Sequence, residues 1–194
     1  MHTQLSYTSY RELIDNLVNQ DKTTGIDQSE AMINYTKLNV HRMNRLDKHI
    51  QIESQLELTI ENIDRHQTWL VISEAWCGDA AQNLPILNKL AELSPMVELQ
   101  IILRDENLDI MDQHLTNGGR SIPKIIFTDE LDQKEIAVWG PRPEPLQQLV
   151  LDNKKTKAKT YDELNKDIQL WYAKDKGLTF QREILTLLTK KGAE

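Results

Sequence analysis

The sequence has very little cysteine, and this scarcity excludes several kinds of chemistry. Cys77 is the only cysteine among 194 residues, so the chain can form neither an internal disulfide nor a metal site built from several thiolates. The five histidines show no close ligand spacing, and we expect neither a metal nor a cofactor. A chain without disulfides suits a reducing compartment, and we therefore predict a cytoplasmic location.

Long apolar runs and an excess of positive charge are also lacking. No stretch approaches the roughly 20 apolar residues that a membrane-spanning helix needs, and the first ten residues show no apolar segment typical of a secretion signal. The formal net charge is −7. Because such a surface repels phosphates, we expect no nucleic-acid partner, and we expect no membrane partner either. The length and the 39% hydrophobic content suit one globular domain.

Helical periodicity is clear in the first third of the chain. Apolar residues recur at helical spacing over residues 7–18 and again over residues 28–47. The second predicted helix carries a basic cluster on its other side, made of His41, Arg42, Arg45 and Lys48. This cluster is either a solvated face or a docking surface for an acidic partner.

The middle of the chain changes to short runs rich in β-formers. Its predicted elements, in chain order, are a strand, a helix, a strand, a helix and two strands, over residues 68–73, 83–93, 97–103, 108–115, 124–127 and 135–139. The strand–helix–strand part predicts two parallel strands in one sheet, and the last two strands predict an antiparallel hairpin.

Helices are predicted again towards the end of the chain. Pro143 and Pro145 are typical of the start of a helix. Thr160 and Glu163 have the spacing of a capping box for the next helix, which Gly177 is suited to end. A last helix is predicted from residue 179 onward.

Chemistry is concentrated in the segment Glu74-Ala-Trp-Cys-Gly-Asp-Ala80, which joins a predicted strand to a predicted helix. A thiol at the start of a helix meets unpaired backbone N–H groups and the positive end of the helix dipole, both of which favour the reactive thiolate. The charges of Glu74 and Asp79 act in the opposite direction and raise the pKa of Cys77. The sequence alone leaves the balance between these influences open.

Three features in this order resemble the thioredoxin superfamily: Trp76-Cys77-Gly78, then Pro85, then Ile122-Pro123. The resemblance implies an α/β thioredoxin-like fold, with a mixed sheet flanked by helices and with helical extensions at both ends. We predict one domain over residues 1–194. Its N-terminal helical extension is residues 1–60, its thioredoxin core residues 61–152 and its C-terminal helices residues 153–194.

The variant Trp-Cys-Gly-Asp motif, with Ser-Ile-Pro before one strand and Trp-Gly-Pro-Arg-Pro after another, is similar to a bacterial branch of thioredoxin-like proteins. The resemblance implies that Cys77 is the attacking thiol. It also implies a substrate-binding wall made of Trp76, Gly78, Asp79, Ile122, Pro123 and Gly140. In this family the proline at the position of Pro123 is cis and faces the sulfur, and the backbone beside it pairs with an extended substrate.

The chain departs from the family at several positions. Ala80 stands where thioredoxins have their resolving cysteine, and Val71 stands near the position of their buried carboxylate. We expect Glu74 and Asp79 to be solvated, with replacement of that carboxylate as the alternative. We expect Arg142 to be a surface residue, with anion binding near the sulfur as the alternative.

These features favour a monothiol mechanism in which Cys77 forms a mixed disulfide that an external thiol resolves. The expected partner is a disulfide-containing or oxidised-thiol protein, or a low-molecular-weight thiol. One alternative is a peptide- or protein-binding module without catalysis, which the loss of the resolving cysteine favours. Another is a redox sensor that uses its single cysteine. The sequence leaves the oligomeric state open.

Overall fold

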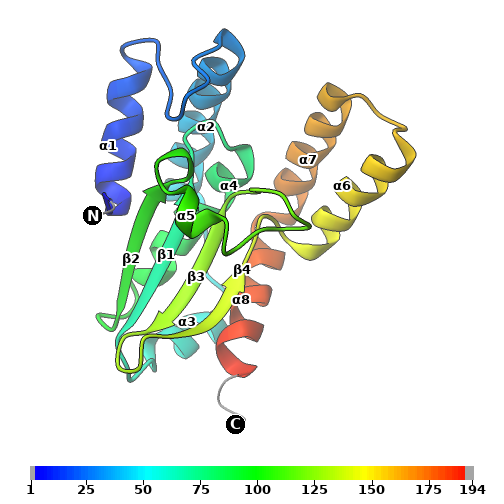
Figure 1. Ribbon diagram of the computed structural model, residues 1–194. Coiled ribbons are helices and arrows are strands. Elements are labelled where there is room, and N and C mark those ends of the chain that lie inside the picture. The colour runs from blue at the N-terminus through cyan, green and yellow to red at the C-terminus, as the bar shows by residue number, and fades with distance from the viewer. Residues whose placement is uncertain (1–2, 191–194) are drawn as a thin grey trace.

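The centre of the molecule is a four-stranded mixed sheet (Figure 1). The structure is a computed structural model that describes residues 3–190. The strands lie in the order β2-β1-β3-β4, with bounds β1 Gln67–Ser73, β2 Val97–Leu103, β3 Lys124–Asp129 and β4 Lys134–Trp139. β1 is parallel to β2 and antiparallel to β3, and β3 is antiparallel to β4. The predicted parallel pair, the predicted hairpin and the thioredoxin-like fold class are confirmed.

Helices cover one face of the sheet, whereas the other face is partly open (Figure 1), since Thr68, Leu70 and Thr128 on it are only half-buried. At the end of β1 the residues Val71, Ile72 and Ser73 are all fully buried, so both faces of the sheet are covered there. Trp69 and Phe127 are also fully buried and meet edge to face across β1 and β3, with ring centroids 5.2 Å apart. The central strands therefore form the core of the molecule.

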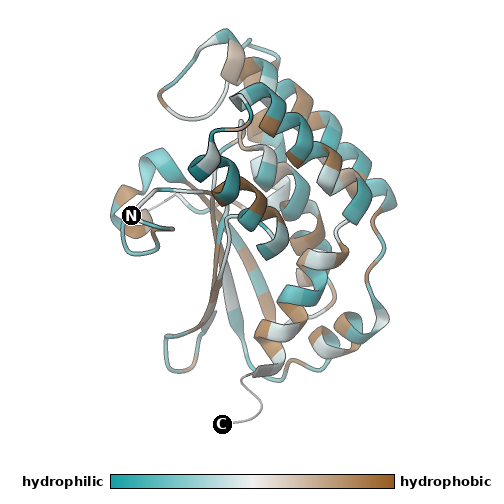
Figure 2. Cartoon of the chain, turned by 90° about the vertical axis from the view of Figure 1, so that its right-hand side faces the viewer, coloured by the Kyte–Doolittle hydropathy of each residue, from teal (hydrophilic) through white to brown (hydrophobic). Residues whose placement is uncertain are grey.

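Most of the helices lie behind the sheet in the view of Figure 1, which leaves much of the near face of the strands in view. The helices are α1 Tyr7–Val18, α2 Glu30–His49, α3 Ser54–Glu61, α4 Gly78–Ala91, α5 Leu108–Met111, α6 Glu144–Thr156, α7 Tyr161–Asp175 and α8 Leu178–Lys190, with a 3-10 turn at Arg104–Glu106. α6 and α7 form a hairpin that projects from the sheet, and α8 runs back along it. Figure 2 shows hydrophobic and hydrophilic residues interleaved along the outer helices, as expected of amphipathic helices. Within residues 3–190, no helix is both long and apolar enough to cross a lipid bilayer.

Three helical predictions differ from the structure. α3 was not predicted, because its eight residues contribute only Leu56 and Ile60 to the core, too few to reveal a helical period. α4 begins at Gly78, which puts Cys77 at the head of the helix as expected, although the apolar helical spacing predicts the helix only from residue 83. α5 is shorter than predicted and ends at Met111.

Two contacts fix the ends of the described chain to the rest of the fold. The backbone of Leu5 exchanges two hydrogen bonds of 2.8 Å with Ile101 and so covers part of the outer edge of β2. In α8 the buried Gln181 accepts from the N–H of Glu53 at 2.8 Å and donates to the carbonyl of Gln51 at 3.0 Å. The second contact ties α8 to the segment between α2 and α3.

The connection into α7 and out of it follows the sequence prediction. Thr160 and Glu163 form the predicted capping box. Gly177 follows α7 in a left-handed conformation with φ of +77°, and a Cβ there would lie 2.4 Å from Cδ1 of Ile86. This close approach brings the junction of α7 and α8 against α4.

Candidate functional site

Cys77 lies at the N-cap of α4 and faces the loop that precedes β3. Its Sγ accepts a hydrogen bond from the N–H of Ala80 at 3.4 Å and donates one to the carbonyl oxygen of Ile122 at 3.3 Å. The residue is only 7% exposed. The sulfur is therefore held between the first turn of α4 and the proline loop.

The proline loop is supported by the loop that follows β4. The peptide bonds Ile122–Pro123 and Gly140–Pro141 are both cis. Gly140 has φ of +121°, and a Cβ at this position would lie 2.2 Å from the carbonyl oxygen of Pro123. Only glycine allows the two loops to approach this closely.

A cavity of about 290 Å³ lies beside the sulfur. Of the residues predicted to form the site, it brings together Trp76, Cys77, Gly78, Asp79 and Ile122. The other two, Pro123 and Gly140, contact each other next to Ile122 but are not among the described residues that line the cavity. The roles of these residues in binding a substrate stay predictions.

Asp79 is buried at 8% exposure, so the prediction that it is solvated was wrong. Its Oδ1 accepts a hydrogen bond from the Tyr172 hydroxyl at 2.8 Å, and its Oδ2 accepts from Nε and Nη2 of Arg142 at 3.1 and 2.5 Å. The prediction of a surface position for Arg142 was also wrong, since its side chain is 16% exposed. Burial lowers the pKa of Arg142, but the charge and hydrogen bond of Asp79, together with Tyr172 and Cys77, produce a net rise.

Glu74 is fully buried as well, again contrary to the prediction of a solvated carboxylate. It accepts the backbone N–H of Asp105 at 2.9 Å, and burial raises the pKa of Glu74. Asp105 in turn pairs with Arg104 at 2.8 Å, and the Arg104 guanidinium lies 4.8 Å from the ring centroid of Trp76. This chain of contacts fixes the tryptophan next to Cys77.

The far side of the cavity is formed by α7. The side chains it contributes are Tyr161, Leu164, Asn165, Ile168 and Gln169. Gln169 accepts a hydrogen bond from Gln82 of α4 at 2.9 Å, and Tyr172 reaches Asp79. Sequence reasoning missed this wall because the periodicity of a helix shows which side is apolar but not which distant element that side covers.

Burial dominates the acidity of the thiol. Burial is the largest cause and the charge of Asp79 the second, and the net result is that the pKa of Cys77 rises to about 12. The N–H of Ala80 and the charge of Arg142 oppose this rise without cancelling it. In this conformation the thiol is therefore protonated at neutral pH, and burial outweighs the favourable position at the head of the helix.

No metal-binding arrangement accompanies the thiol. Across residues 3–190, the histidine, cysteine, aspartate and glutamate side chains form no group of three that could hold a metal ion.

Comparisons with known proteins agree on the fold. A family model described as thioredoxin matches residues 25–172, a span that includes α2, α3 and α6 and most of α7. No curated protein matches the chain.

Two solved structures resemble the whole chain. The crystal structure of a protein of unknown function from Pseudomonas aeruginosa is 20% identical with a TM-score of 0.59, and the match covers 97% of this chain and 99% of that one. The crystal structure of an HIV epitope-scaffold is 21% identical with a TM-score of 0.58, covering 98% and 100% of the two chains. At these identities the likeness concerns the fold alone.

Proposed function

The chain belongs to the thioredoxin family, and from this premise we propose that it acts in thiol–disulfide exchange with Cys77 as its lone nucleophile. The observation that carries the proposal is the position of the sulfur. Sγ lies at the N-cap of α4, within hydrogen-bonding distance of the Ala80 N–H and the Ile122 carbonyl. A thiolate formed there is stabilised by the helix N-terminus and faces a cavity large enough for a small substrate.

The proposed reaction has two exchange steps. The Cys77 thiol loses its proton to solvent, and the thiolate attacks one sulfur of a disulfide. A bond forms between Sγ and that sulfur, while the other sulfur leaves as a thiolate and takes up a proton. An external thiolate then attacks the substrate sulfur of the mixed disulfide and expels Cys77. The net result is the exchange of one thiol partner of the disulfide for another, with no need for a second cysteine in the chain.

The raised pKa of Cys77 sets a condition on this mechanism. Because burial is the largest cause of the rise, the thiol becomes reactive when water reaches the sulfur or when a substrate replaces the side chains that bury it. α7 closes the far side of the cavity, and Gln169 and Tyr172 hold it to the site. We therefore propose that exchange requires a displacement of α7.

The size of the cavity favours a small substrate. A low-molecular-weight disulfide or an oxidised small thiol fits a space of about 290 Å³, whereas an extended protein segment would compete with α7 for the same side of the proline loop. A reducing cytoplasm would supply the external thiol. Membership of the bacterial branch with the Trp-Cys-Gly-Asp motif stays a prediction.

A second function, ligand binding without catalysis, is favoured by one specific observation. The thiol is protonated and buried beside the ion pair of Asp79 and Arg142, which is the environment of an inert structural cysteine rather than an activated one. A binding module would keep the cavity and need no thiolate. Redox sensing requires an accessible thiol of low pKa, and the buried sulfur disfavours it.

The decisive experiment is to incubate the native protein with glutathione disulfide at pH 7.5 and to measure its intact mass. Thiol exchange predicts one glutathione adduct, which is absent in Cys77→Ser and is removed by added reduced glutathione. If the folded protein stays unmodified while the urea-unfolded protein is readily modified, the exchange proposal is wrong and the binding module is favoured.

A further inference from the structure

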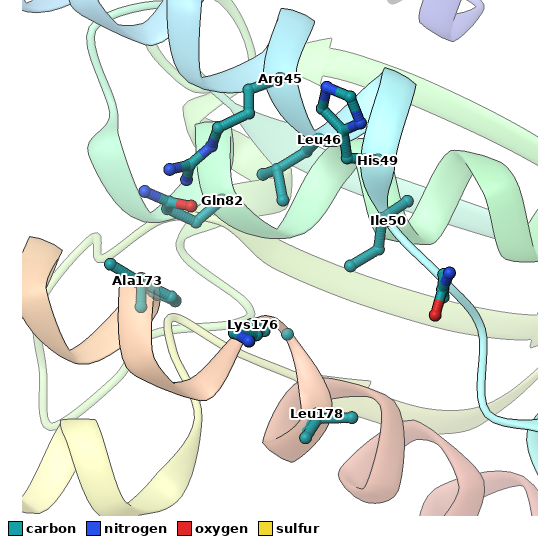
Figure 3. A pocket seen from close by; sticks show the side chains of 11 residues that line it. Arg45, Leu46, His49, Ile50, Gln82, Ala173, Lys176 and Leu178 are labelled. Carbon is teal, nitrogen blue, oxygen red and sulfur yellow. The ribbon is translucent and has the colours of Figure 1, made fainter.

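A second cavity of about 400 Å³ lies apart from the thiol, where the end of α2 meets α4, the end of α7 and the start of α8 (Figure 3). None of the residues that line it lines the cavity beside Cys77. Its volume lies in the range of small-molecule sites, and helices bound it on several sides. This position and size suit a compact organic ligand better than a flat protein partner.

The interior of this second cavity is largely apolar. Leu46 from α2, Ile50 directly after α2 and Leu178 from α8 contribute aliphatic surface. Tyr172 also lines it, but its hydroxyl is already engaged by Asp79, so the tyrosine offers mainly its ring to this space. An aliphatic chain placed on these side chains would leave water and gain hydrophobic free energy.

The rim of the same cavity is cationic. Its two cations are Arg45 from α2 and Lys176 directly after α7, and Figure 3 shows them on opposite sides of the space. No salt bridge joins Arg45 or Lys176 to a carboxylate of the residues described, 3–190.

The acidic residues closest in sequence to Arg45 and Lys176 bind other partners. Asp47 pairs with Arg11, and Asp175 accepts hydrogen bonds from Thr179. Positive charge therefore gathers without internal compensation on a protein whose net charge is −7. Arg45 belongs to the basic cluster of α2, so this part of the cluster borders a cavity rather than only bulk solvent.

We infer that this cavity binds a small amphipathic carboxylate. The carboxylate lies between Arg45 and Lys176, where charge-assisted hydrogen bonds are available, and the aliphatic chain lies on Leu46, Ile50 and Leu178. The inference is independent of the thiol chemistry, because it uses no residue of the Cys77 cavity.

Octanoate is the probe for this inference. It is titrated into the ¹⁵N-labelled protein below its micelle concentration, and amide shifts are followed by NMR. We expect saturable binding at one site, with the largest shifts in the end of α2 and in the junction of α7 and α8. The double variant Arg45→Gln/Lys176→Gln should weaken octanoate binding about tenfold or more, because two charge-assisted contacts are lost.

The matched control is Lys48→Gln. Lys48 is an exposed cation of the same helix that does not line the cavity, so this variant should bind octanoate like the unaltered protein. Octylammonium, which has the same chain and the opposite charge, should bind at least tenfold more weakly. The inference is overturned if octanoate causes no saturable shifts, if its shifts map to the Cys77 cavity, if octylammonium binds equally well, or if the double variant keeps the original affinity.

Discussion

Replacing Asp79 with asparagine should make Cys77 react faster. Asp79 is buried two positions after the thiol, and its charge is the second cause of the raised pKa of Cys77, after burial. The asparagine removes that negative charge and leaves the Arg142 guanidinium without its carboxylate partner. Both changes favour the thiolate, so the pKa of Cys77 should fall.

The size of the effect follows from two opposing factors. A charge this close shifts a pKa by about 1 to 3 units. Each unit raises the thiolate fraction about tenfold at a pH well below the pKa, while the lower basicity makes the thiolate about threefold less nucleophilic. Asp79→Asn should therefore accelerate alkylation at pH 8 by about 3- to 30-fold.

The assay is alkylation by iodoacetamide followed by intact mass from pH 7 to pH 11, on protein shown by circular dichroism to be folded. The matched control is Asp79→Glu, which keeps a carboxylate charge beside the thiol and should therefore be alkylated at a rate close to that of the unaltered protein. An unchanged rate in folded Asp79→Asn, or equal acceleration in Asp79→Glu, would refute the electrostatic reasoning.

Three further predictions concern the contact between the two proline-containing loops, the role of α7 beside the thiol, and the pH dependence of stability. Gly140→Ala should lower the melting temperature much more than Gly118→Ala. A Cβ at position 140 would lie 2.2 Å from the carbonyl oxygen of Pro123, whereas a Cβ at position 118 would have nothing within 4 Å. An equal fall in melting temperature for the two variants would contradict the close approach of the two loops. Thr160→Ala removes the capping box of α7 and should destabilise the protein by about 1 kcal/mol. It should also speed the alkylation of Cys77, because α7 closes one side of the cavity beside the thiol. An unchanged alkylation rate would contradict a role of α7 in protecting the thiol.

The pH prediction in this group uses chemical denaturation. The unfolded thiol ionises near pH 8.5, whereas the folded thiol keeps its proton until about pH 12. Between these values the folded state binds more protons, so the free energy of unfolding falls as the pH rises, by up to about 1.4 kcal/mol per unit. Cys77→Ser has no thiol to ionise, so its free energy of unfolding should fall less over this pH range. An identical pH dependence of the free energy of unfolding in the two proteins would contradict the raised pKa of Cys77.

Much of the fold could be predicted because the relevant signals are local. The periodicity over residues 7–18 gave the bounds of α1, and the β-rich runs located all four strands of the sheet. α3 was missed because Leu56 and Ile60 are separated by a single turn, which a loop can equally contain. Cys77 was correctly predicted at the head of α4, but the apolar spacing shows the helix only from residue 83, because residues 78–82 include no large apolar side chain.

The candidate site was predictable in its position but not in its electrostatics. The motif and the proline loop placed Cys77 beside Ile122, as the thiol hydrogen bond shows. The burial of Asp79 could not be predicted, because its partners Arg142 and Tyr172 lie far away along the chain and only the packed structure brings them to it. A carboxylate is costly to bury without such partners, so its sequence context alone favours solvent.

The proton affinity of Cys77 also bears on how long an adduct survives. A thiol that keeps its proton until about pH 12 is a poor leaving group, because the same environment that disfavours the thiolate slows its expulsion from a disulfide. In the proposed cycle the second step must expel this sulfur. Once formed, the mixed disulfide should therefore have a long dwell time.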